Sequence, residues 1–137
     1  MAVLLVATYA YFQRHASSAT SGSASANADA VLAAAFREHA SGIQVEGQGT
    51  VDRILPDDND SSHHQRFILR LASGQDVLIA HNIDLARRVS SLRAGDVVAF
   101  KGEYEWNAKG GVIHWTHRDP AGRHVAGWLK HNGVVIQ

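Results

Sequence analysis

The sequence predicts a mainly β domain: a small five-stranded barrel with a helix between its third and fourth strands, an N-terminal helix and a C-terminal β-hairpin. Three features support this prediction. From Ile43 onward, polar and apolar residues alternate, as they do in strands that bury one face. Short stretches rich in Gly, Ser, Asn and Asp separate these segments. The pair Asn132-Gly133 stands between two short apolar arms, which is a strong hairpin signal.

The length and the charge of the chain limit the possible classes of protein. Its 137 residues suffice for one domain with a modest core. Thirteen basic and thirteen acidic residues cancel, which argues against a general polyanion binder but leaves room for a local basic groove. The sequence has no cysteine, so disulfide bonds and thiolate ligands or nucleophiles are excluded.

The N-terminal segment predicts export. The apolar run Ala2–Phe12 is too short to cross a bilayer and is typical of the apolar region of a signal peptide. A tract rich in Ala and Ser follows, with A-x-A sequences such as Ala24–Ala26, although no Lys or Arg precedes the run. We therefore expect residues 1–27 to form a leader and a flexible linker outside the fold, either cleaved or kept as an anchor. A buried first strand is the alternative.

Residues 28–42 are expected to form a helix. Asn27 or Asp29 can cap its N-terminus through a side-chain oxygen, and Gly42 is a natural C-terminal stop. The alanine-rich composition has a high helix propensity. An apolar stripe along one face is formed by Val31, Leu32, Ala35, Phe36 and His39. We expect this stripe to pack on the barrel.

Residues 43–137 are expected to form the barrel and the hairpin. The first strand begins at Ile43 and places Gly47 and Gly49 on its inward side, where they indicate a bulge or a tight bend. An exposed loop is expected over Pro56–His64. A strand with alternating Phe67, Leu69 and Leu71 follows, and Asp76–Ala80 is its expected hairpin partner.

A second helix is expected over His81–Asp96, with Leu85, Val89 and Leu92 as its apolar stripe and Gly95 as its stop. Two further strands, Asp96–Trp106 and Gly110–His117, come next. This order of elements, with a helix between the third and fourth strands, is typical of the OB-fold. An SH3-like barrel or an irregular β-sandwich is the competing architecture.

A cluster of polar and aromatic residues near the C-terminus is the candidate site. Four of the nine histidines fall within residues 114–131, beside tryptophan, arginine and aspartate. A turn around Asp119 is expected to return the chain to one rim of the barrel. The candidate ligand-binding residues are His114, His117, Asp119, Arg123, His124, Trp128 and His131. Imidazoles, forked guanidinium donors and an indole ring suit an anion or a flat ligand.

Metal and catalytic functions are less well supported. Side chains on a strand alternate between faces, so His114 and His117 point to opposite sides, and we predict no bound metal ion, although metal binding stays an alternative. The chain has no G-x-S-x-G and no H-E-x-x-H motif. We therefore predict neither catalytic residues nor a cofactor.

Two further alternatives involve the same region. Single-stranded nucleic acid is one possible partner, not the favoured one, with Tyr104 and Trp106 as stacking platforms. The other alternative is purely structural: Asp119, Arg123 and His124 form a network that pins the C-terminus, with the Arg123 guanidinium bridging to Asp119.

The C-terminal third resembles the signature of a family of small exported bacterial proteins of unknown function. The residues that carry the resemblance are Trp115, Thr116, His117, Asp119, Pro120, Gly122, Arg123, His124, Gly127, Trp128, His131 and Gly133. The chain has Ile136 where such patterns have an aromatic residue. The resemblance covers about Ile43 to Gln137 and implies these domain limits and export, but no reaction, cofactor or partner.

The combined prediction is a monomeric OB-like domain, exported to the periplasm or secreted, that binds a small or oligomeric ligand without transforming it. Beyond the possible N-terminal anchor we expect no stable membrane span.

Overall fold

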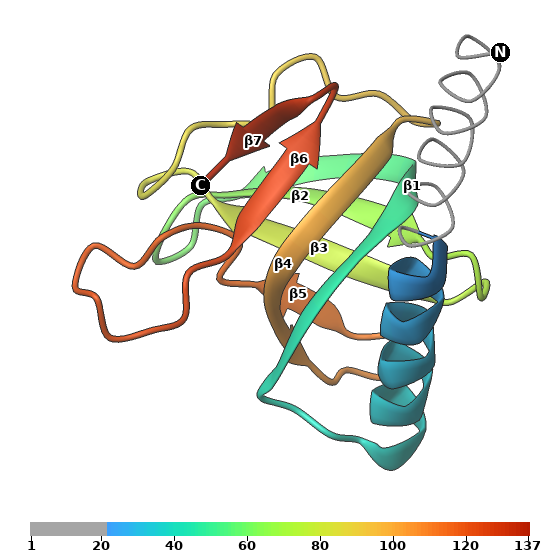
Figure 1. The fold of residues 1–137 in the computed structure, drawn as a ribbon. Coiled ribbons are helices and arrows are strands. Elements are labelled where there is room, and N and C mark those ends of the chain that lie inside the picture. The colour runs from blue at the N-terminus through green and yellow to red at the C-terminus, as the bar shows by residue number, and fades with distance from the viewer. Residues whose placement is uncertain (1–21) are drawn as a thin grey trace, which may run out of the picture.

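The computed structural model describes residues 22–137 and shows a mainly β protein, as predicted (Figure 1). One helix, over residues 22–38, precedes seven strands. The strands are β1 (Ile43–Asp58), β2 (His64–Arg70), β3 (Asp76–Asn82), β4 (Val97–Glu105), β5 (Val112–His114), β6 (Trp128–His131) and β7 (Val134–Ile136). The apolar run Ala2–Phe12 lies outside the described residues. Within residues 22–137, no helix has the length and apolar character needed to cross a membrane.

Five of the strands form a closed ring. The long β1 pairs antiparallel with β4 through its first half and with β2 through its second half. β2 pairs with β3, and β3 pairs in parallel with β5, which in turn pairs antiparallel with β4. The ring therefore runs β1-β2-β3-β5-β4 and returns to β1. It has the five strands that the sequence predicted.

An inward-facing glycine allows β1 to pair with both β2 and β4. Thr50 is the residue at which β1 changes partner, because it pairs with Val97 of β4 and with Arg70 of β2. A Cβ atom on the preceding Gly49 would lie 2.9 Å from the carbonyl oxygen of Arg70. Only a residue without a side chain lets the two strands approach this closely. The prediction of a crowded bend at this position is confirmed.

Alternating apolar side chains fill the ring. The fully buried ones include Phe67 and Leu69 of β2, Val77 and Ile79 of β3, Val98, Phe100 and Tyr104 of β4, Ile113 of β5 and Leu129 of β6. Removing apolar surface from water stabilises the fold by about 25 cal/mol for each Å² that is buried. The same alternation sends the intervening polar residues of β4 and β5 to the outer surface, where the candidate site lies.

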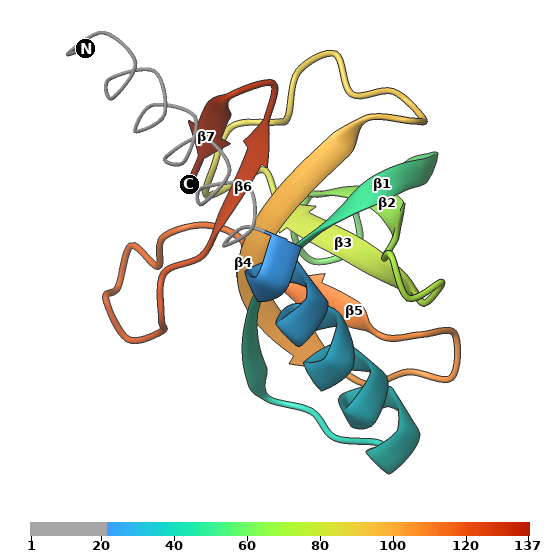
Figure 2. The ribbon, with the colours of Figure 1, turned by 45° about the vertical axis from the view of Figure 1, so that its right-hand side comes forward.

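The N-terminal helix packs against the ring through Leu32 and Ala35, as the apolar stripe predicted (Figure 2). Val31 is exposed, which the stripe did not predict. The helix ends in a turn in which the N–H of Ala40 donates to the carbonyl oxygen of Ala35 at 2.9 Å. His39 adopts a φ of 54° at this turn. Residues 22–27 were expected to be linker and are helical instead.

Trp106, at the end of β4, holds the C-terminal end of the helix. Its indole N–H donates to the carbonyl oxygen of Phe36 at 3.0 Å. Its ring stacks on the His39 ring, with the two ring centroids 4.0 Å apart. The helix is therefore attached to the ring at both its apolar face and its C-terminus.

The predicted helix between β3 and β4 is wrong: residues 83–96 form turns and irregular loop. The reason is competition from long-range side-chain hydrogen bonds. The side chain of Gln65 accepts from the N–H of Val89 at 2.8 Å and donates to its carbonyl oxygen at 3.1 Å. The ring of His81 donates to the carbonyl oxygen of Arg87 at 3.0 Å. These bonds use the backbone groups that a helix would need, and Leu85 is exposed.

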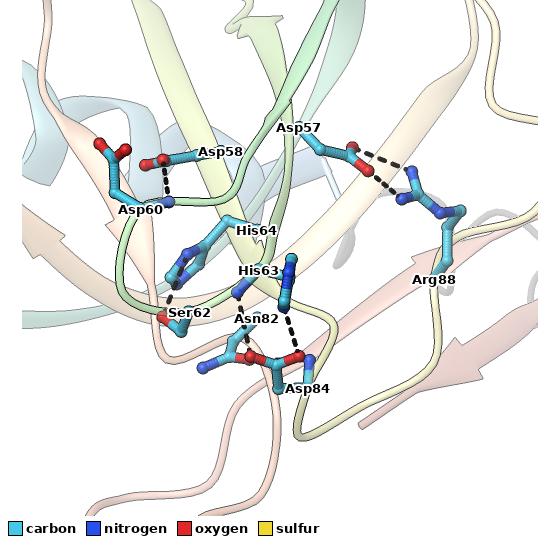
Figure 3. A network of polar contacts seen from close by, with 9 residues as sticks. All are labelled: Asp57, Asp58, Asp60, Ser62, His63, His64, Asn82, Asp84 and Arg88. Carbon is cyan, nitrogen blue, oxygen red and sulfur yellow. Dashed lines mark hydrogen bonds and ion pairs between the residues drawn. The ribbon is translucent and has the colours of Figure 1, made fainter.

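The loop expected from Pro56 is shorter than predicted, because β1 continues to Asp58 with a register shift after Leu55. An exposed network of ion pairs joins this region to the loop after β3 (Figure 3). Arg88 pairs with Asp57. His63 lies 2.9 Å from Asp84. The network therefore fastens two loops to each other at the surface.

The C-terminal hairpin is confirmed. Asn132 and Gly133 have φ angles of 50° and 76°, as a two-residue turn with two positive φ angles requires. β6 adds the hairpin to the ring by pairing with the segment Val98–Lys101 of β4. β5 pairs with the same strand farther along, from Glu103 to Glu105. Gly102 therefore lies where β4 passes from one neighbour to the other.

Candidate functional site

The loop from β5 to β6, residues 115–127, carries most of the predicted site residues. It extends from the ring on the side away from the N-terminal helix (Figure 1 and Figure 2). Gly127 returns the loop to β4 so closely that a Cβ atom on it would lie 2.4 Å from the carbonyl oxygen of Lys101. This close approach brings the end of the loop beside the outer surface of β4.

Asp119 organises the loop through backbone contacts. Its carboxylate accepts hydrogen bonds from the N–H groups of Ala121 and Arg123, both at 2.9 Å, and of His124 at 3.0 Å. The bonds from Ala121 and Arg123 hold the pKa of this carboxyl below its usual value. The predicted bridge from the Arg123 guanidinium is wrong, because the backbone N–H of Arg123 makes the contact and its side chain is exposed. Asp119 is therefore a positioning residue for the loop.

Two of the predicted histidines meet at Glu103. His114 is the direct cross-strand neighbour of Glu103 in the pairing of β4 with β5. The Nε2 atom of His114 lies 3.4 Å from Oε2 of Glu103 and 3.6 Å from Oε1 of Glu105. The Nε2 atom of His124, which comes from the loop, lies 3.4 Å from the same Oε2 atom of Glu103. We call these four residues, Glu103, Glu105, His114 and His124, the His/Glu cluster.

The ring of His124 is held in a defined orientation. Its Nδ1 lies 2.8 Å from the carbonyl oxygen of Val125. A carbonyl oxygen only accepts, so the Nδ1 atom carries the proton and the Nε2 atom of the neutral ring presents a lone pair. The ring also stacks on Trp115, with centroids 4.0 Å apart and planes 9° from parallel. Trp115 adopts a φ of 56°, a costly conformation for a tryptophan that this packing maintains.

The ring of His114 presents an unsatisfied nitrogen. Its Nε2 atom is shielded from solvent and forms no hydrogen bond with any residue in the described part of the chain. The side chain as a whole is 27% exposed, and that of Glu105 is 53% exposed. The cluster therefore lies at the surface, within reach of a ligand from solution, while one of its nitrogens lacks a partner.

His117 and His131, also predicted for the site, are buried elsewhere. The Nδ1–H of His117 donates to the carbonyl oxygen of Arg118 at 2.7 Å, and its ring lies beside that of His81, with centroids 6.3 Å apart. His131 lies 2.8 Å from a carboxylate oxygen of Asp96. This contact fastens the C-terminal hairpin to the start of β4.

His81 is a neutral core residue. Its Nδ1 atom lies 2.8 Å from the hydroxyl oxygen of Thr116, and the other ring nitrogen donates to Arg87. Burial lowers the pKa of His81 to about 4. His81, Thr116 and His117 thus form a buried polar group at the base of the loop.

Aromatic residues considered for base stacking have structural roles. Tyr104 is fully buried, and its hydroxyl donates to the carbonyl oxygen of Gly110 at 3.0 Å. The indole N–H of Trp106 is bound to the C-terminal end of the helix. Trp128 lines a groove of about 540 Å³ between the helix, β1 and β4, together with Val31 and Val45. Trp128 is the cross-strand partner of Lys101 and so shares the outer surface of β4 with Glu103.

Sequence reasoning missed Glu103, Glu105 and Trp115 as parts of this arrangement. A signal was present, because Glu103 and Glu105 alternate with buried Gly102 and Tyr104 and so share the outer face of one strand. Their meeting with His114 depends on the register between β4 and β5.

A family model described as "Protein of unknown function (DUF3465)" matches residues 15–137. The chain belongs to this family. Every residue of the His/Glu cluster lies within the DUF3465 match. No curated protein matches the sequence.

Proposed function

We propose that this DUF3465 domain is a non-catalytic binding module and that the His/Glu cluster is its binding surface. The observation that carries the proposal is the convergence on Glu103: one carboxylate oxygen lies 3.4 Å from the Nε2 atoms of two imidazoles, one from a strand and one from a loop. Backbone bonds to Asp119, the stack on Trp115 and the tight passage at Gly127 all favour this convergence.

The chemistry of the cluster favours a cationic ligand. Carboxylates accept and do not donate, and neutral imidazoles present a lone pair at the nitrogen that is not protonated. Within residues 22–137 no Lys or Arg forms an ion pair with these side chains, so with neutral imidazoles the cluster attracts positive charge. An anion, the ligand class that the arginines of the sequence suggested, would be repelled by Glu103 and Glu105.

Other features support a binding role outside the cytoplasm. The apolar run Ala2–Phe12 and the absence of cysteine favour an exported domain. The order β1-β2-β3-β5-β4, with β3 parallel to β5, favours an OB-like scaffold, an architecture used widely for ligand binding. The hydroxyl of Thr116 is fully buried beside His81 and so does not act as a nucleophile at the surface. We expect the domain to act as a monomer.

The proposal is tested by an NMR titration of the histidine rings in the full-length chain. The ligands are Zn²⁺, spermidine, a short single-stranded DNA and a cell-wall oligosaccharide. We expect at least one of the cations to shift the His114 and His124 resonances, while His63 and His64 serve as an internal control. If no cation moves His114 and His124, or if DNA or oligosaccharide alone does so, the proposed cation-binding surface is wrong.

A further inference from the structure

Resting on the proposed function, we infer that the cation is a divalent transition-metal ion of the Zn²⁺ class, held by the His/Glu cluster. Its ligands are Nε2 of His114, Nε2 of His124 and the carboxylates of Glu103 and Glu105. The sequence predicted metal binding only as an alternative, because His114 and His117 were expected on opposite faces of a strand; the cluster instead combines His114 with His124 and two glutamates.

Three of the separations between donor atoms are close to those of a tetrahedral metal site. Metal–ligand bonds of about 2.0–2.1 Å at tetrahedral angles place neighbouring ligand atoms roughly 3.3 Å apart. The Nε2 atoms of His114 and His124 each lie 3.4 Å from Oε2 of Glu103, and Nε2 of His114 lies 3.6 Å from Oε1 of Glu105. Donor atoms of Glu103, Glu105 and His114 all lie within 4.8 Å of one another. Among the described residues, this is the one group of three or more such donors that is close enough. His124 is outside this group of three and adjoins it through its 3.4 Å contact with Glu103.

The hydrogen-bonding geometry of the rings favours a metal ion over simple ion pairs. Nε2 of His114 has no acceptor in hydrogen-bonding geometry among the described residues, so an N–H group there would be buried without a partner, which is costly. A metal ion would instead use the lone pair of this shielded nitrogen. His124 has the outer contact that metal-binding histidines almost always have, an Nδ1–H group that donates to a backbone carbonyl, here that of Val125.

The donor set selects a class of metal. Two imidazole nitrogens with carboxylate oxygens suit Zn²⁺, Cu²⁺, Ni²⁺ and Co²⁺. Mg²⁺ and Ca²⁺ prefer oxygen ligands alone, and Cu⁺ prefers the sulfur ligands that a chain without cysteine cannot supply through thiolates. Four protein ligands form a closed coordination shell, which agrees with a non-catalytic role.

The histidines of the exposed network provide a matched control (Figure 3). Asp84 accepts from both the backbone N–H and the ring of His63, at 3.0 Å and 2.9 Å. His64 lies 3.5 Å from the hydroxyl of Ser62. These two rings have local partners, and in the described part of the chain they belong to no group of three close donor atoms. They should therefore not contribute to tight metal binding.

Isothermal titration calorimetry of the full-length chain with Zn²⁺ at pH 7.5 tests the inference. We expect one Zn²⁺ per chain, and no comparable binding of Mg²⁺ or Ca²⁺. Glu103→Gln and His124→Ala should each weaken Zn²⁺ binding by at least about tenfold, whereas the double variant His63→Ala/His64→Ala should bind as the wild type does. Co²⁺ should give the visible absorption of a tetrahedral nitrogen and oxygen site. Thermal unfolding without metal verifies that each variant is folded, and Glu105→Gln provides a second variant at an exposed position.

Three results would overturn the inference. If spermidine shifts His114 and His124 but Zn²⁺ does not bind, the ligand class is wrong and the proposed binding surface stands. If neither cation binds, both proposals are wrong. If Zn²⁺ binds equally well to wild type, Glu103→Gln and His124→Ala, the metal site lies elsewhere in the chain.

Discussion

Gly102→Ala should destabilise the protein through a single added methyl group. A Cβ atom at this position would lie 2.5 Å from the carbonyl oxygen of His114 and 2.8 Å from Cγ2 of Ile113. Real Cβ atoms essentially never approach another atom within 3.0 Å, so β5 must move away from β4 by about 0.5 Å. Overpacking of this kind costs about 1–3 kcal/mol. For a chain of this size, that loss lowers Tm by roughly 3–15 °C.

Urea unfolding, followed by circular dichroism, measures this change in the free energy of unfolding. Gly22→Ala is the control, because the structure has nothing within 4 Å of a Cβ atom at Gly22, and alanine favours the helix. The control should be as stable as the wild type or slightly more stable. A Gly102→Ala variant within about 0.5 kcal/mol of the wild type would refute the close packing of β4 against β5.

Three further predictions concern individual side chains. Arg123→Ala should change the free energy of unfolding by less than about 0.5 kcal/mol, because its side chain is exposed and its backbone makes the contact to Asp119; a loss above 1 kcal/mol in urea unfolding would restore the guanidinium bridge. His131 holds the pKa of Asp96 below its usual value by hydrogen bonding, so Asp96→Asn should be less stable than the wild type near pH 6. That difference should shrink as the pH falls below the unfolded pKa of about 3.9 and through the lower folded pKa, and a difference that stays constant down to pH 2 would contradict this reading. The NMR signals of the His81 ring should not titrate between pH 8 and pH 5.5, since burial lowers the pKa of His81 to about 4; a midpoint near 6.5 would show that the ring is solvated.

Local patterns predicted most of the strands. Alternation is a property of the residues themselves, so the buried rows of β2, β3 and β4 were visible in the sequence. The Asn132-Gly133 pair predicted the two-residue turn of the C-terminal hairpin, because both residues tolerate positive φ angles. Gly49 stands at an inward position of β1, where an apolar side chain is usual, and this indicated a bend in the strand. The structure shows that the backbone of Arg70 lies too close for a side chain there.

Features that depend on distant partners were not predictable. The stripe of Leu85, Val89 and Leu92 has helical spacing, but hydrogen bonds from Gln65, in β2, hold Val89 in an extended loop. His114 and His124 were among the predicted ligand-binding residues, yet their meeting point at Glu103 is set by the strand register and by the return of the loop.

Anomalous X-ray diffraction from crystals of the full-length chain grown with Zn²⁺ tests the central claim most directly. We expect an anomalous peak about 2.0–2.2 Å from Nε2 of His114, Nε2 of His124 and a carboxylate oxygen of Glu103. Data from Glu103→Gln crystals grown in the same way should lack this peak. A wild-type peak at His63 and Asp84 alone, or no peak near Glu103 at saturating Zn²⁺, would contradict the assignment of the His/Glu cluster as a metal site.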